Sequence, residues 1–367
     1  MAGGGTAGHV FPALAFARRL VDDHGADVRF VGTGAGVEAK LVPAAGFPFV
    51  EVEARPFTRG LSLGLLRAPF TLLRSIRRCR PLVRDADVVV GMGGYASAPA
   101  VVAGARARRP VVLHEQNAIP GLANRVLARR ATAVAVSFAD AVKRFPRRVR
   151  TVVTGNPVRD VIAAVPAERE ALAKEAWEEL GLEPGRLTVV AFGGSQGALH
   201  IDRAVVGACR LLRDRGDLQT LLLTGAAHHD SIAAAIPERA AMLVRALPFL
   251  DRMELAYAVA DLVVSRAGAT TVAEITACGI PSLLIPYPYA TANHQEANAR
   301  AVQRAGGASV LLDDQLTAEE LAERIVNLLD HRERLEAMAR SAKTFGRPDA
   351  AERVAELVVE VGRGSPS

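Results

Sequence analysis

The sequence predicts an α/β protein built from two doubly wound parallel sheets. Short apolar runs alternate with amphipathic helical segments along the whole chain, a pattern typical of parallel sheets covered by helices. Half of the 367 residues are hydrophobic and only 5% are aromatic, which disfavours an all-β sandwich or a disordered chain. The strand–helix cycle restarts near residue 187 and leads into a third Gly-rich loop, so the same pattern occurs in both halves of the chain.

Periodicity gives the expected elements in order. In the first half the apolar runs predict strands at residues 28–31, 88–90, 111–113, 134–136 and 151–153. In the second half they predict strands at residues 187–192, 221–223, 242–244, 262–264, 283–285 and 309–312. Helices are expected at residues 11–22, 269–277 and 349–361, residues 317–343 are expected to form charged amphipathic helices, and residues 32–36 are expected to form a simple turn. A break at residues 155–159 predicts an N-terminal domain at 1–155, a second domain at 156–345 and a final helix with its tail at 346–367.

The chain begins with a Gly-rich loop. Gly3, Gly5 and Gly8 match the spacing of a phosphate-binding loop, which should follow a strand. Only Met1 and Ala2 precede it, so we expect this sequence to lack the first strand of the N-terminal sheet. Adding roughly six apolar residues upstream, the length of a common strand, is expected to raise both stability and activity.

The charge balance is basic. A net charge of +6 and a pI near 9.6 indicate an anionic partner, although a general preference for arginine would have the same effect. The segment from Arg55 to Arg84 holds eight arginines and no acidic residue, interleaved with apolar side chains. It predicts either a helix on an anionic membrane surface or a core-packed helix with a solvated basic face. Nothing else in the sequence indicates nucleic acid, because aromatic residues that could stack on bases are scarce.

Membrane spans, disulfides and metal sites are not expected. No apolar run reaches the roughly 18 residues of a spanning helix, and the N-terminus lacks the pattern of a signal peptide, so we expect an intracellular protein. Cys79, Cys209 and Cys278 are far apart in the sequence and are expected to be core thiols. No paired acidic motif follows a strand, so we expect neither a metal ion nor another cofactor.

The stretch from Asp261 to Val302 is typical of a nucleotide site. The expected strand at residues 262–264 runs through a short loop into a helix that begins Ala269-Thr270-Thr271. Small residues there leave the free N–H groups of the first turn open to a phosphate. Glu274, one turn into the helix, suits a pair of sugar hydroxyls. The alternative is an ordinary helix whose first-turn glutamate is solvated and favoured by the helix dipole.

Six motifs in this order give a resemblance to a known family. GGGTAGHVFPALA, GMGGYASAPA, VVLHEQNAIPGLANR, GNPVR, GGSQGA, and SRAGATTVAE with HQEANA resemble the bacterial MurG family. Its members add N-acetylglucosamine to a lipid-linked MurNAc-pentapeptide precursor of peptidoglycan. The resemblance implies a GT-B fold, in which two Rossmann-like domains face a cleft and the last helix returns to the first domain. It also implies a peripheral protein on the cytoplasmic face of the bacterial cell membrane, with lipid I bound by the N-terminal domain and UDP-GlcNAc by the second.

The resemblance further implies the site residues. The residues implied to contact UDP-GlcNAc are Thr6, Ala7, Gly8, Asn117, Arg159, Ser195, Leu250, Ala269, Thr270, Thr271, Glu274 and Gln295. Within this set Leu250 would lie near the uracil, Glu274 would hold the ribose, and Asn117 and Gln295 would contact the sugar. Gly93, Gly94 and Tyr95 would line a pocket for the acceptor pyrophosphate. The family's first loop usually reads GGTGGH, and Ala7 stands here in place of a glycine.

An inverting transfer of this kind needs a general base and stabilisation of the departing diphosphate. His9 is the first candidate base, because it follows the first Gly loop and an ordinary histidine pKa of about 6.5 suits proton abstraction. Glu115 is the second candidate. Without a metal ion, the diphosphate charge would be met by backbone N–H groups, Ser195, Arg159 and the Thr270-Thr271 helix tip. Ser195 is not expected to be a nucleophile, because GGSQG is not the GxSxG elbow.

Three other functions remain open from the sequence. One is a GT-B enzyme that uses another sugar acceptor. Another is an NAD-dependent oxidoreductase, suggested by the first Gly loop, although Phe30-Val31 is followed by Gly32 rather than by an acidic residue. The third is a non-catalytic basic protein that binds membranes or nucleic acid through the segment from Arg55 to Arg84.

Overall fold

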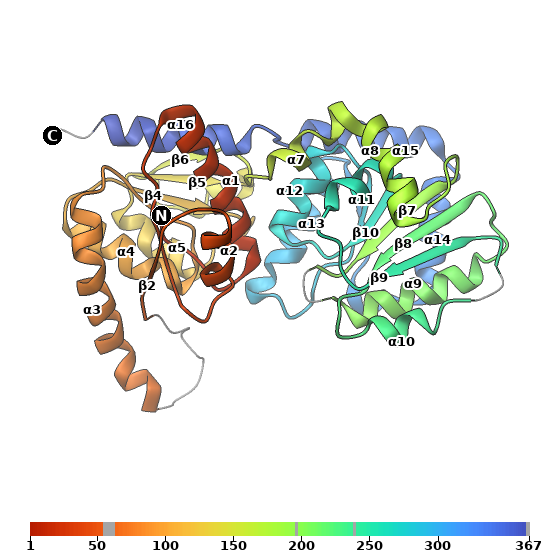
Figure 1. Ribbon diagram of the computed structural model, residues 1–367, viewed down its shortest axis with the longest axis horizontal. Coiled ribbons are helices and arrows are strands. Elements are labelled where there is room, and N and C mark those ends of the chain that lie inside the picture. Colours follow the sequence, from red (N-terminus) through yellow and green to blue (C-terminus); the bar gives the residue numbers. More distant parts are fainter. Residues whose placement is uncertain (54–62, 195–196, 238–239, 365–367) are drawn as a thin grey trace. The chain divides into compact units, whose positions relative to one another are not determined.

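A computed structural model of the protein describes residues 1–53, 63–194, 197–237 and 240–364, with the side chains of Ala7 and of residues 63–69 left undescribed. The chain divides into two compact units. Unit 1 comprises Met1–Arg159 and Asp349–Ser367, and unit 2 comprises Asp160–Pro348. Each unit is a parallel sheet with helices packed on it (Figure 1). The α/β prediction with two doubly wound sheets is therefore confirmed.

The sheet of unit 1 is joined across its middle by a single residue. Its strands are β1 (Phe30–Gly32), β2 (Phe49–Glu51), β3 (Val89–Gly91), β4 (Val111–Glu115), β5 (Ala133–Val136) and β6 (Arg150–Val153). β1 pairs with β2, and β3 to β6 pair in order, all in parallel. Ala2 forms parallel bridges to Val31 of β1 and Gly91 of β3. The strand that the sequence was expected to lack is thus represented by this one bridged residue, and the first Gly loop leaves the sheet directly after it.

Eight helices of unit 1 are described, and they flank this sheet. They are α1 (Ala7–His24), α2 (Glu38–Ala44), α3 (Leu63–Arg84), α4 (Gly94–Arg106), α5 (Leu122–Leu127), η1 (Ala128–Arg130), α6 (Ala139–Val142) and α16 (Ala350–Arg363). The C-terminal α16 buries Val354, Leu357 and Val358 in the same core as Phe16 and Leu20 of α1. These apolar side chains recur at helical spacing, so burying that stripe holds the end of the chain in unit 1.

Unit 2 has a six-stranded parallel sheet in the order β12-β11-β10-β7-β8-β9. The strands are β7 (Leu187–Phe192), β8 (Leu218–Leu223), β9 (Leu243–Leu247), β10 (Leu262–Ser265), β11 (Ser282–Leu284) and β12 (Ala308–Val310). The strand order reverses between β7 and β10, where open sheets of this type bind ligands at the carboxyl ends of the strands. The Gly-rich loop after β7 and the loop before residue 269 both start at that point.

Helices cover both faces of this second sheet. They are α7 (Asp160–Ala163), α8 (Val165–Leu180), α9 (Leu199–Leu211), α10 (His229–Ala233), α11 (Met253–Val259), α12 (Ala269–Ala277), η2 (Thr291–Asn293), α13 (His294–Arg304), η3 (Asp313–Gln315), α14 (Ala318–Leu329) and α15 (Arg332–Phe345). The central strands β7, β8 and β10 are buried almost throughout, as parallel strands covered on both faces should be.

The three cysteines are free and buried, as expected of core thiols. Burial raises the pKa of the Cys79 and Cys209 thiols to about 11, so both are protonated at neutral pH. Among the described helices, none is long and apolar enough to cross a membrane.

Candidate functional site

The first and second Gly loops of unit 1 pack against each other at the carboxyl edge of its sheet. A methyl group built on Gly5 would lie 3.6 Å from the ring of Tyr95. One built on Gly94 would lie 3.4 Å from the carbonyl oxygen of Gly4 and 3.8 Å from the His9 ring. Gly5, Gly93 and Gly94 also have φ values of 88°, 86° and 71°, which favour glycine. The structure therefore brings His9 together with the proposed acceptor residues Gly93, Gly94 and Tyr95.

Glu38 holds the first Gly loop in place. Its carboxylate accepts hydrogen bonds from the Gly5 N–H (2.9 Å), the Thr33 N–H (2.9 Å) and the Thr33 hydroxyl (2.7 Å). Burial alone would raise the pKa of Glu38, but these hydrogen bonds bring it below its ordinary value. A methyl group on Gly4 or Gly36 would lie 2.0 Å from this carboxylate, so both positions need glycine. Residues 32–36 are thus more than the simple turn that the sequence indicated.

His9 lies in the first turn of α1, half-buried. Its Nδ1 is 2.9 Å from the hydroxyl oxygen of Thr6, the residue that precedes the helix in an extended conformation. When Nδ1 carries the proton, Thr6 accepts it as a hydrogen bond and Nε2 becomes the basic nitrogen. Thr6 therefore orients the ring through the nitrogen opposite to the one that would take a proton.

Glu115 is enclosed at the end of β4, with 2% of its surface exposed. One oxygen accepts from the backbone N–H and the amide of Asn117, at 3.0 and 3.4 Å. The other accepts from the Gly121 N–H at 3.0 Å and the Asn124 amide at 2.9 Å. Burial raises the pKa of Glu115 although these bonds oppose the rise. With both oxygens engaged, Glu115 organises the loop that carries Asn117, and this geometry disfavours it as the general base.

His114 is a structural histidine in this loop. The Gln116 amide nitrogen donates both to the Met92 carbonyl (2.9 Å) and to His114 Nδ1 (3.1 Å), so Nδ1 is an acceptor. His114 Nε2 then donates to the Gly155 carbonyl at 3.2 Å. Complete burial lowers the pKa of His114 to about 4, so the ring is neutral.

Arg159 lies beside the helix that carries His9. Its guanidinium stacks over the Phe11 ring at 5.8 Å from the ring centre. Gly8 is exposed on the same helix, next to Ala7. The structure thus gathers Arg159 and the first-loop residues around the N-terminus of α1.

The N-terminus of α12 in unit 2 follows the loop at the end of β10. Gly268 is the residue that precedes the helix, and it has no side chain that could cap the first turn. No acidic residue lies in that turn, where Thr270 and Thr271 are half-buried and Ala269 is almost fully buried. The first turn of this nine-residue helix is thus of a kind that suits an anion, because helix N-termini carry free N–H groups, and the phosphate role of Thr270 and Thr271 stays a prediction.

Glu274 lies one turn further along α12 and is fixed by a tyrosine. The Tyr257 hydroxyl donates a hydrogen bond to Glu274 Oε2 at 2.9 Å. Tyr257 belongs to α11 and is 1% exposed, with its ring edge-on to Phe192 at 6.3 Å. One carboxylate oxygen is thus held by the core, and the half-buried carboxylate is oriented at the edge of the sheet.

Gln295 is oriented by the loop that follows β11. Its side-chain oxygen accepts from the Tyr287 N–H at 2.9 Å. The same loop is held by Arg266, whose guanidinium donates to the Ile285 and Pro286 carbonyls at 3.2 Å each and pairs with Asp313. Arg266 is 9% exposed and lies over the Tyr287 ring. This buried arginine therefore sets the position of the residue that holds Gln295.

Of the other expected site residues, the structure describes Leu250 but not Ser195. Leu250 is half-buried in the loop between β9 and α11. Ser195 lies outside the described residues, although the glycines around it are described. A methyl group on Gly197 would lie 2.5 Å from the Thr224 carbonyl, and one on Gly193 would lie 2.3 Å from the Ala198 nitrogen. The loop after β7 therefore packs too closely for side chains at these glycines.

Comparison with known proteins identifies the family. The glycosyltransferase family 28 N-terminal domain matches residues 1–136, and its C-terminal domain matches residues 188–354. A Halothermothrix orenii protein is 41% identical over 99% of this chain and 98% of its own length. A Bacillus licheniformis protein is 40% identical over 98% of each. Both are named UDP-N-acetylglucosamine–N-acetylmuramyl-(pentapeptide) pyrophosphoryl-undecaprenol N-acetylglucosamine transferase. The chain belongs to the MurG family.

Solved structures agree with this membership. The crystal structure of Acinetobacter baumannii MurG is 30% identical, covers 97% of each chain and superposes with a TM-score of 0.77. The calicheamicin glycosyltransferase CalG4, at 18% identity and a TM-score of 0.66, shares the fold. Membership of the MurG family makes the chain a hexosyltransferase and sets aside the oxidoreductase and the non-catalytic interpretations.

Several residues that position the site were not predicted from the sequence. Glu38, Tyr257, Asn124 and Arg266 each hold an expected site residue or its loop. A signal existed for Glu38, which lies two residues after the end of the Gly-rich residues 32–36. In the parts of the chain that the structure describes, no group of three or more His, Cys, Asp or Glu side chains could hold a metal ion.

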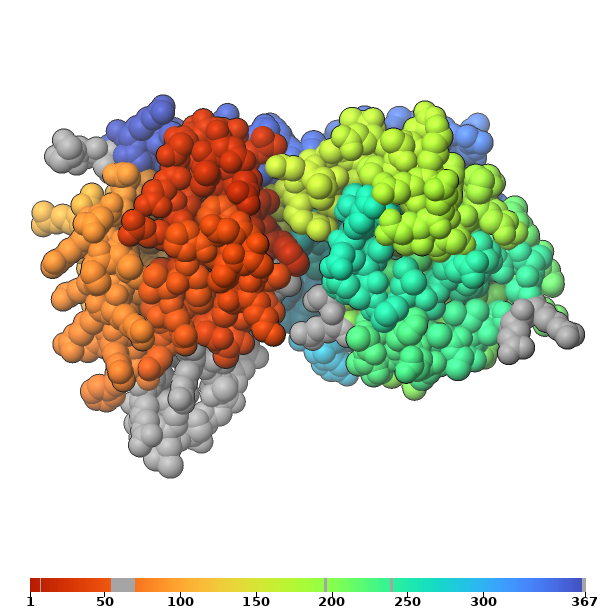
Figure 2. Space-filling view, in the orientation of Figure 1, coloured from red at the N-terminus to blue at the C-terminus, as the bar shows by residue number. Residues whose placement is uncertain are grey.

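Helix α3 has one buried face and one exposed basic face, as expected of a packed helix, and binding of the exposed face to a membrane stays a prediction. Ser75, Ile76, Cys79 and Val83 are buried, so one face packs on unit 1. The other face exposes Phe70, 76% accessible, and Leu73, 40% accessible, among exposed arginines at positions 74, 77, 78, 80 and 84. Figure 2 shows this part of the chain, in orange, at the surface of unit 1. The N-terminal part of the segment, residues 54–62, lies outside the described residues.

Proposed function

We propose that the protein transfers GlcNAc from UDP-GlcNAc to the C4 hydroxyl of MurNAc in lipid I, giving lipid II and UDP. The relatives that cover nearly the whole chain carry the name of this reaction. The observation that carries the proposal is the arrangement of α12, where an open N-terminus precedes a glutamate fixed by Tyr257. A diphosphate at the helix end and a ribose at Glu274 match a nucleoside diphosphate.

The donor is assigned to unit 2. The first-turn N–H groups of α12 donate hydrogen bonds to the diphosphate, and Glu274 accepts hydrogen bonds from the ribose hydroxyls. Gln295 contacts the sugar with the side of its amide that Tyr287 does not bind. Leu250 contacts the uracil, and Ser195, with Asn117 and Thr6 to Gly8 from unit 1, completes the set that the family resemblance implies.

The acceptor is assigned to unit 1. Gly93, Gly94 and Tyr95 lie against the first Gly loop, which supports one anion site built from two Gly-rich loops. The acceptor's pyrophosphate binds there, so that the C4 hydroxyl of MurNAc is presented to His9. Glu38 supports this site indirectly, because it fixes the backbone of Gly5.

The reaction is an inverting displacement in one step. The C4 oxygen of the acceptor forms a bond to C1 of GlcNAc while the bond from C1 to the β-phosphate oxygen breaks. The hydroxyl proton passes to Nε2 of His9, and UDP leaves with the electron pair of the broken bond. Thr6 supports this role by accepting the Nδ1 proton, whereas the carboxylate of Glu115 is occupied by four donors.

The departing diphosphate is stabilised without a metal ion in this proposal. Its charge is met by the N-terminus of α12, by Arg159 and by Ser195. A preorganised helix end and a guanidinium offer charge-assisted hydrogen bonds to phosphate oxygens, which are stronger than neutral ones.

The protein works at the cytoplasmic face of the bacterial cell membrane as a peripheral enzyme. The exposed face of α3 supports this proposal, because Phe70 and Leu73 can enter the interface while the neighbouring arginines meet anionic head groups. In the cell this activity would serve cell-wall growth and, through it, cell shape and division.

The test is transfer of labelled GlcNAc to a short-chain lipid I analogue in the presence of EDTA. We expect product formation from UDP-GlcNAc, with the α-linked donor giving a β-linked product by NMR. Loss of turnover in EDTA would contradict the metal-free step, and a retained α linkage would contradict inversion. Transfer to a different sugar acceptor, but not to lipid I, would favour another UDP-sugar glycosyltransferase of the same fold.

A further inference from the structure

Asp313 joins loops of unit 2 that are far apart in the sequence. It follows β12, and each of its carboxylate oxygens has a partner. Oδ1 pairs with the guanidinium of Arg266, and Oδ2 lies 3.1 Å from Nδ1 of His200. A carboxylate only accepts hydrogen bonds, so Nδ1 of His200 carries a proton and donates to it. Because Arg266 follows β10 and His200 lies in the first turn of α9, Asp313 connects three loops at the carboxyl edge of the sheet.

Arg266 carries this connection to Gln295. Its guanidinium donates to the carbonyl oxygens of Ile285 and Pro286, at 3.2 Å each. The next residue, Tyr287, donates its backbone N–H to the side-chain oxygen of Gln295 at 2.9 Å. A continuous chain of polar contacts therefore runs from the carboxylate, through the arginine and the loop after β11, to the amide that is assigned to the sugar.

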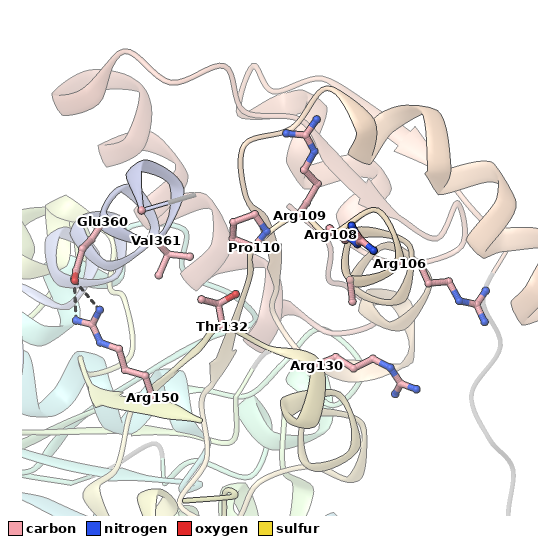
Figure 3. A pocket seen from close by; sticks show the side chains of 11 residues that line it. Arg106, Arg108, Arg109, Pro110, Arg130, Thr132, Arg150, Glu360 and Val361 are labelled. Carbon is pink, nitrogen blue, oxygen red and sulfur yellow. Dashed lines mark hydrogen bonds and ion pairs between the residues drawn. The ribbon is translucent and has the colours of Figure 1, made fainter. Parts of the chain in front are cut away.

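The surroundings of Arg266 differ from those of exposed arginines elsewhere in the chain. Arginines also line a pocket of about 600 Å³ in unit 1, where Figure 3 shows Arg150 paired with Glu360 at one end. Arg106 and Arg130 extend at the other end, and all three arginines are exposed, so solvent and salt screen their charges. The side chain of Arg266 is only 10% exposed. It therefore depends more strongly on its carboxylate partner, because a buried charge that loses its partner is strongly unfavourable.

We propose that Asp313 is a positioning residue for the sugar of the donor, supported by His200 through its second carboxylate oxygen. Asp313 fixes Arg266, and Arg266 fixes the backbone that orients the amide of Gln295. This role rests on the proposed function, because it takes UDP-GlcNAc as the donor and Gln295 as its sugar contact. The consequence is selective. Affinity for UDP-GlcNAc depends on Asp313, whereas affinity for UDP, which has no sugar beyond the diphosphate, does not.

Calorimetric titrations with UDP-GlcNAc and with UDP separate the two affinities. Asp313→Asn removes the charge and nearly keeps the size of the side chain, so Arg266 loses its ionic partner. We expect the Kd for UDP-GlcNAc to rise about fivefold or more and the Kd for UDP to change less than about twofold. Equal weakening of both ligands, as a purely structural role would give, or no weakening of UDP-GlcNAc binding, would overturn the proposal.

Asp314→Asn is the matched control, because Asp314 is the exposed neighbour of Asp313 and the substitution removes the same charge. It is expected to change the Kd for UDP-GlcNAc less than about twofold, since salt screens exposed charges. Weakening equal to that of Asp313→Asn would assign the effect to general charge and overturn the proposal. Thermal unfolding of each variant sets a titration temperature at which all of them are folded.

Gln295→Ala separates a failure of this role from a failure of the proposed function. It is expected to weaken UDP-GlcNAc binding, and Asp313→Asn should add less than about twofold in that background, because its effect passes through the same amide. Full additivity of the two substitutions would overturn the role of Asp313 and leave the sugar contact in place. If Gln295→Ala leaves UDP-GlcNAc binding unchanged, the sugar contact of the proposed function is wrong, and the role of Asp313 is overturned with it.

Discussion

The Tyr257 hydroxyl donates to Glu274 Oε2 at 2.9 Å and ties the core of unit 2 to the candidate ribose ligand. Tyr257 is 1% exposed, so this hydroxyl has been removed from water and the hydrogen bond replaces its solvation. The carboxylate is thereby held in one orientation before a nucleotide arrives. Preorganisation of this kind reduces the entropy lost on binding.

Tyr257→Phe is expected to weaken UDP binding about three- to tenfold, because one net hydrogen bond of about 0.5–1.5 kcal/mol no longer orients Glu274. Calorimetry with UDP measures the change. Glu274→Gln is expected to weaken UDP binding further. In the Glu274→Gln background the phenylalanine substitution should add little, since its effect passes through the carboxylate. Full additivity of the two substitutions would contradict this link.

Thr6→Val is expected to lower kcat by about tenfold or more, because His9 loses the partner that fixes its ring and proton position. Thr6→Ser keeps the hydroxyl and should retain most of the activity. Because Thr6 is also assigned a contact with UDP-GlcNAc, the KM for UDP-GlcNAc can rise, but the loss in kcat should be the larger effect if Thr6 acts through His9. A large rise in KM with kcat unchanged would instead assign Thr6 to donor binding alone.

Glu38→Gln is expected to destabilise the protein by about 1–3 kcal/mol, because the amide cannot accept hydrogen bonds at both former oxygen positions. The folded-state pKa of Glu38 is lowered, so its ionised form stabilises the fold above the unfolded pKa. That contribution is lost as the pH falls through the folded pKa. Urea unfolding should therefore show a large difference between variant and wild type at pH 7 and a smaller one below pH 4. A difference that does not change with pH would argue against an ionised Glu38.

Asp202→Asn is expected to stabilise the protein at pH 8. Asp202 of α9 is fully buried, and neither of its side-chain oxygens has a hydrogen-bond partner among the residues that the structure describes. Burial raises the pKa of Asp202 to about 7, although the charge of Arg266 opposes the rise. Because the folded pKa exceeds the unfolded one, wild-type stability should fall as the pH rises from about 4 to 7.

The asparagine side chain cannot ionise, so the free energy of unfolding of the Asp202→Asn variant should exceed that of the wild type by about 1–3 kcal/mol at pH 8. This difference should disappear near pH 4, where Asp202 is protonated in the folded wild type. Thermal unfolding across this pH range measures it. A variant that is less stable than wild type at pH 8 would show that the Asp202 carboxylate is used in the folded protein.

Phe70→Ser is expected to reduce binding to vesicles that contain phosphatidylglycerol by about fivefold or more, because an aromatic ring can no longer enter the interface. Phe70 is 76% exposed, so the substitution should leave the unfolding midpoint unchanged. Leu211→Ser is the control, since Leu211 is 55% exposed on a helix of unit 2. Vesicle sedimentation with both variants measures the difference. Equal loss with both would contradict a specific role for α3.

The sequence predicted elements well where their limits have a local cause. β7 and α12 have the expected bounds, because β7 is a long apolar run and α12 lies between Gly268 and Gly279. β2 was missed because it is short and only partly buried at the edge of its sheet. Pairing of Ala2 with β1 and β3 was missed because the two residues before the Gly loop, Met1 and Ala2, are too few to show a periodicity.

The candidate site was predictable only in part for a similar reason. Motifs indicated Glu274, His9 and the Gly loops, because short spacings within one segment carry that information. The supporting contacts join segments far apart in the chain, such as Glu38 with Gly5. Such contacts depend on how strands pair and helices pack, which a local pattern does not encode. Glu115 was thus open as a base until its four donors were known.

Single-turnover transfer of GlcNAc to a lipid I analogue by wild type and His9→Ala tests the central claim most directly. The account predicts that the wild type forms product and releases UDP, while the variant is slower by about 100-fold or more with UDP binding unchanged. Near-normal turnover by His9→Ala, or no transfer to lipid I by the wild type, would contradict it.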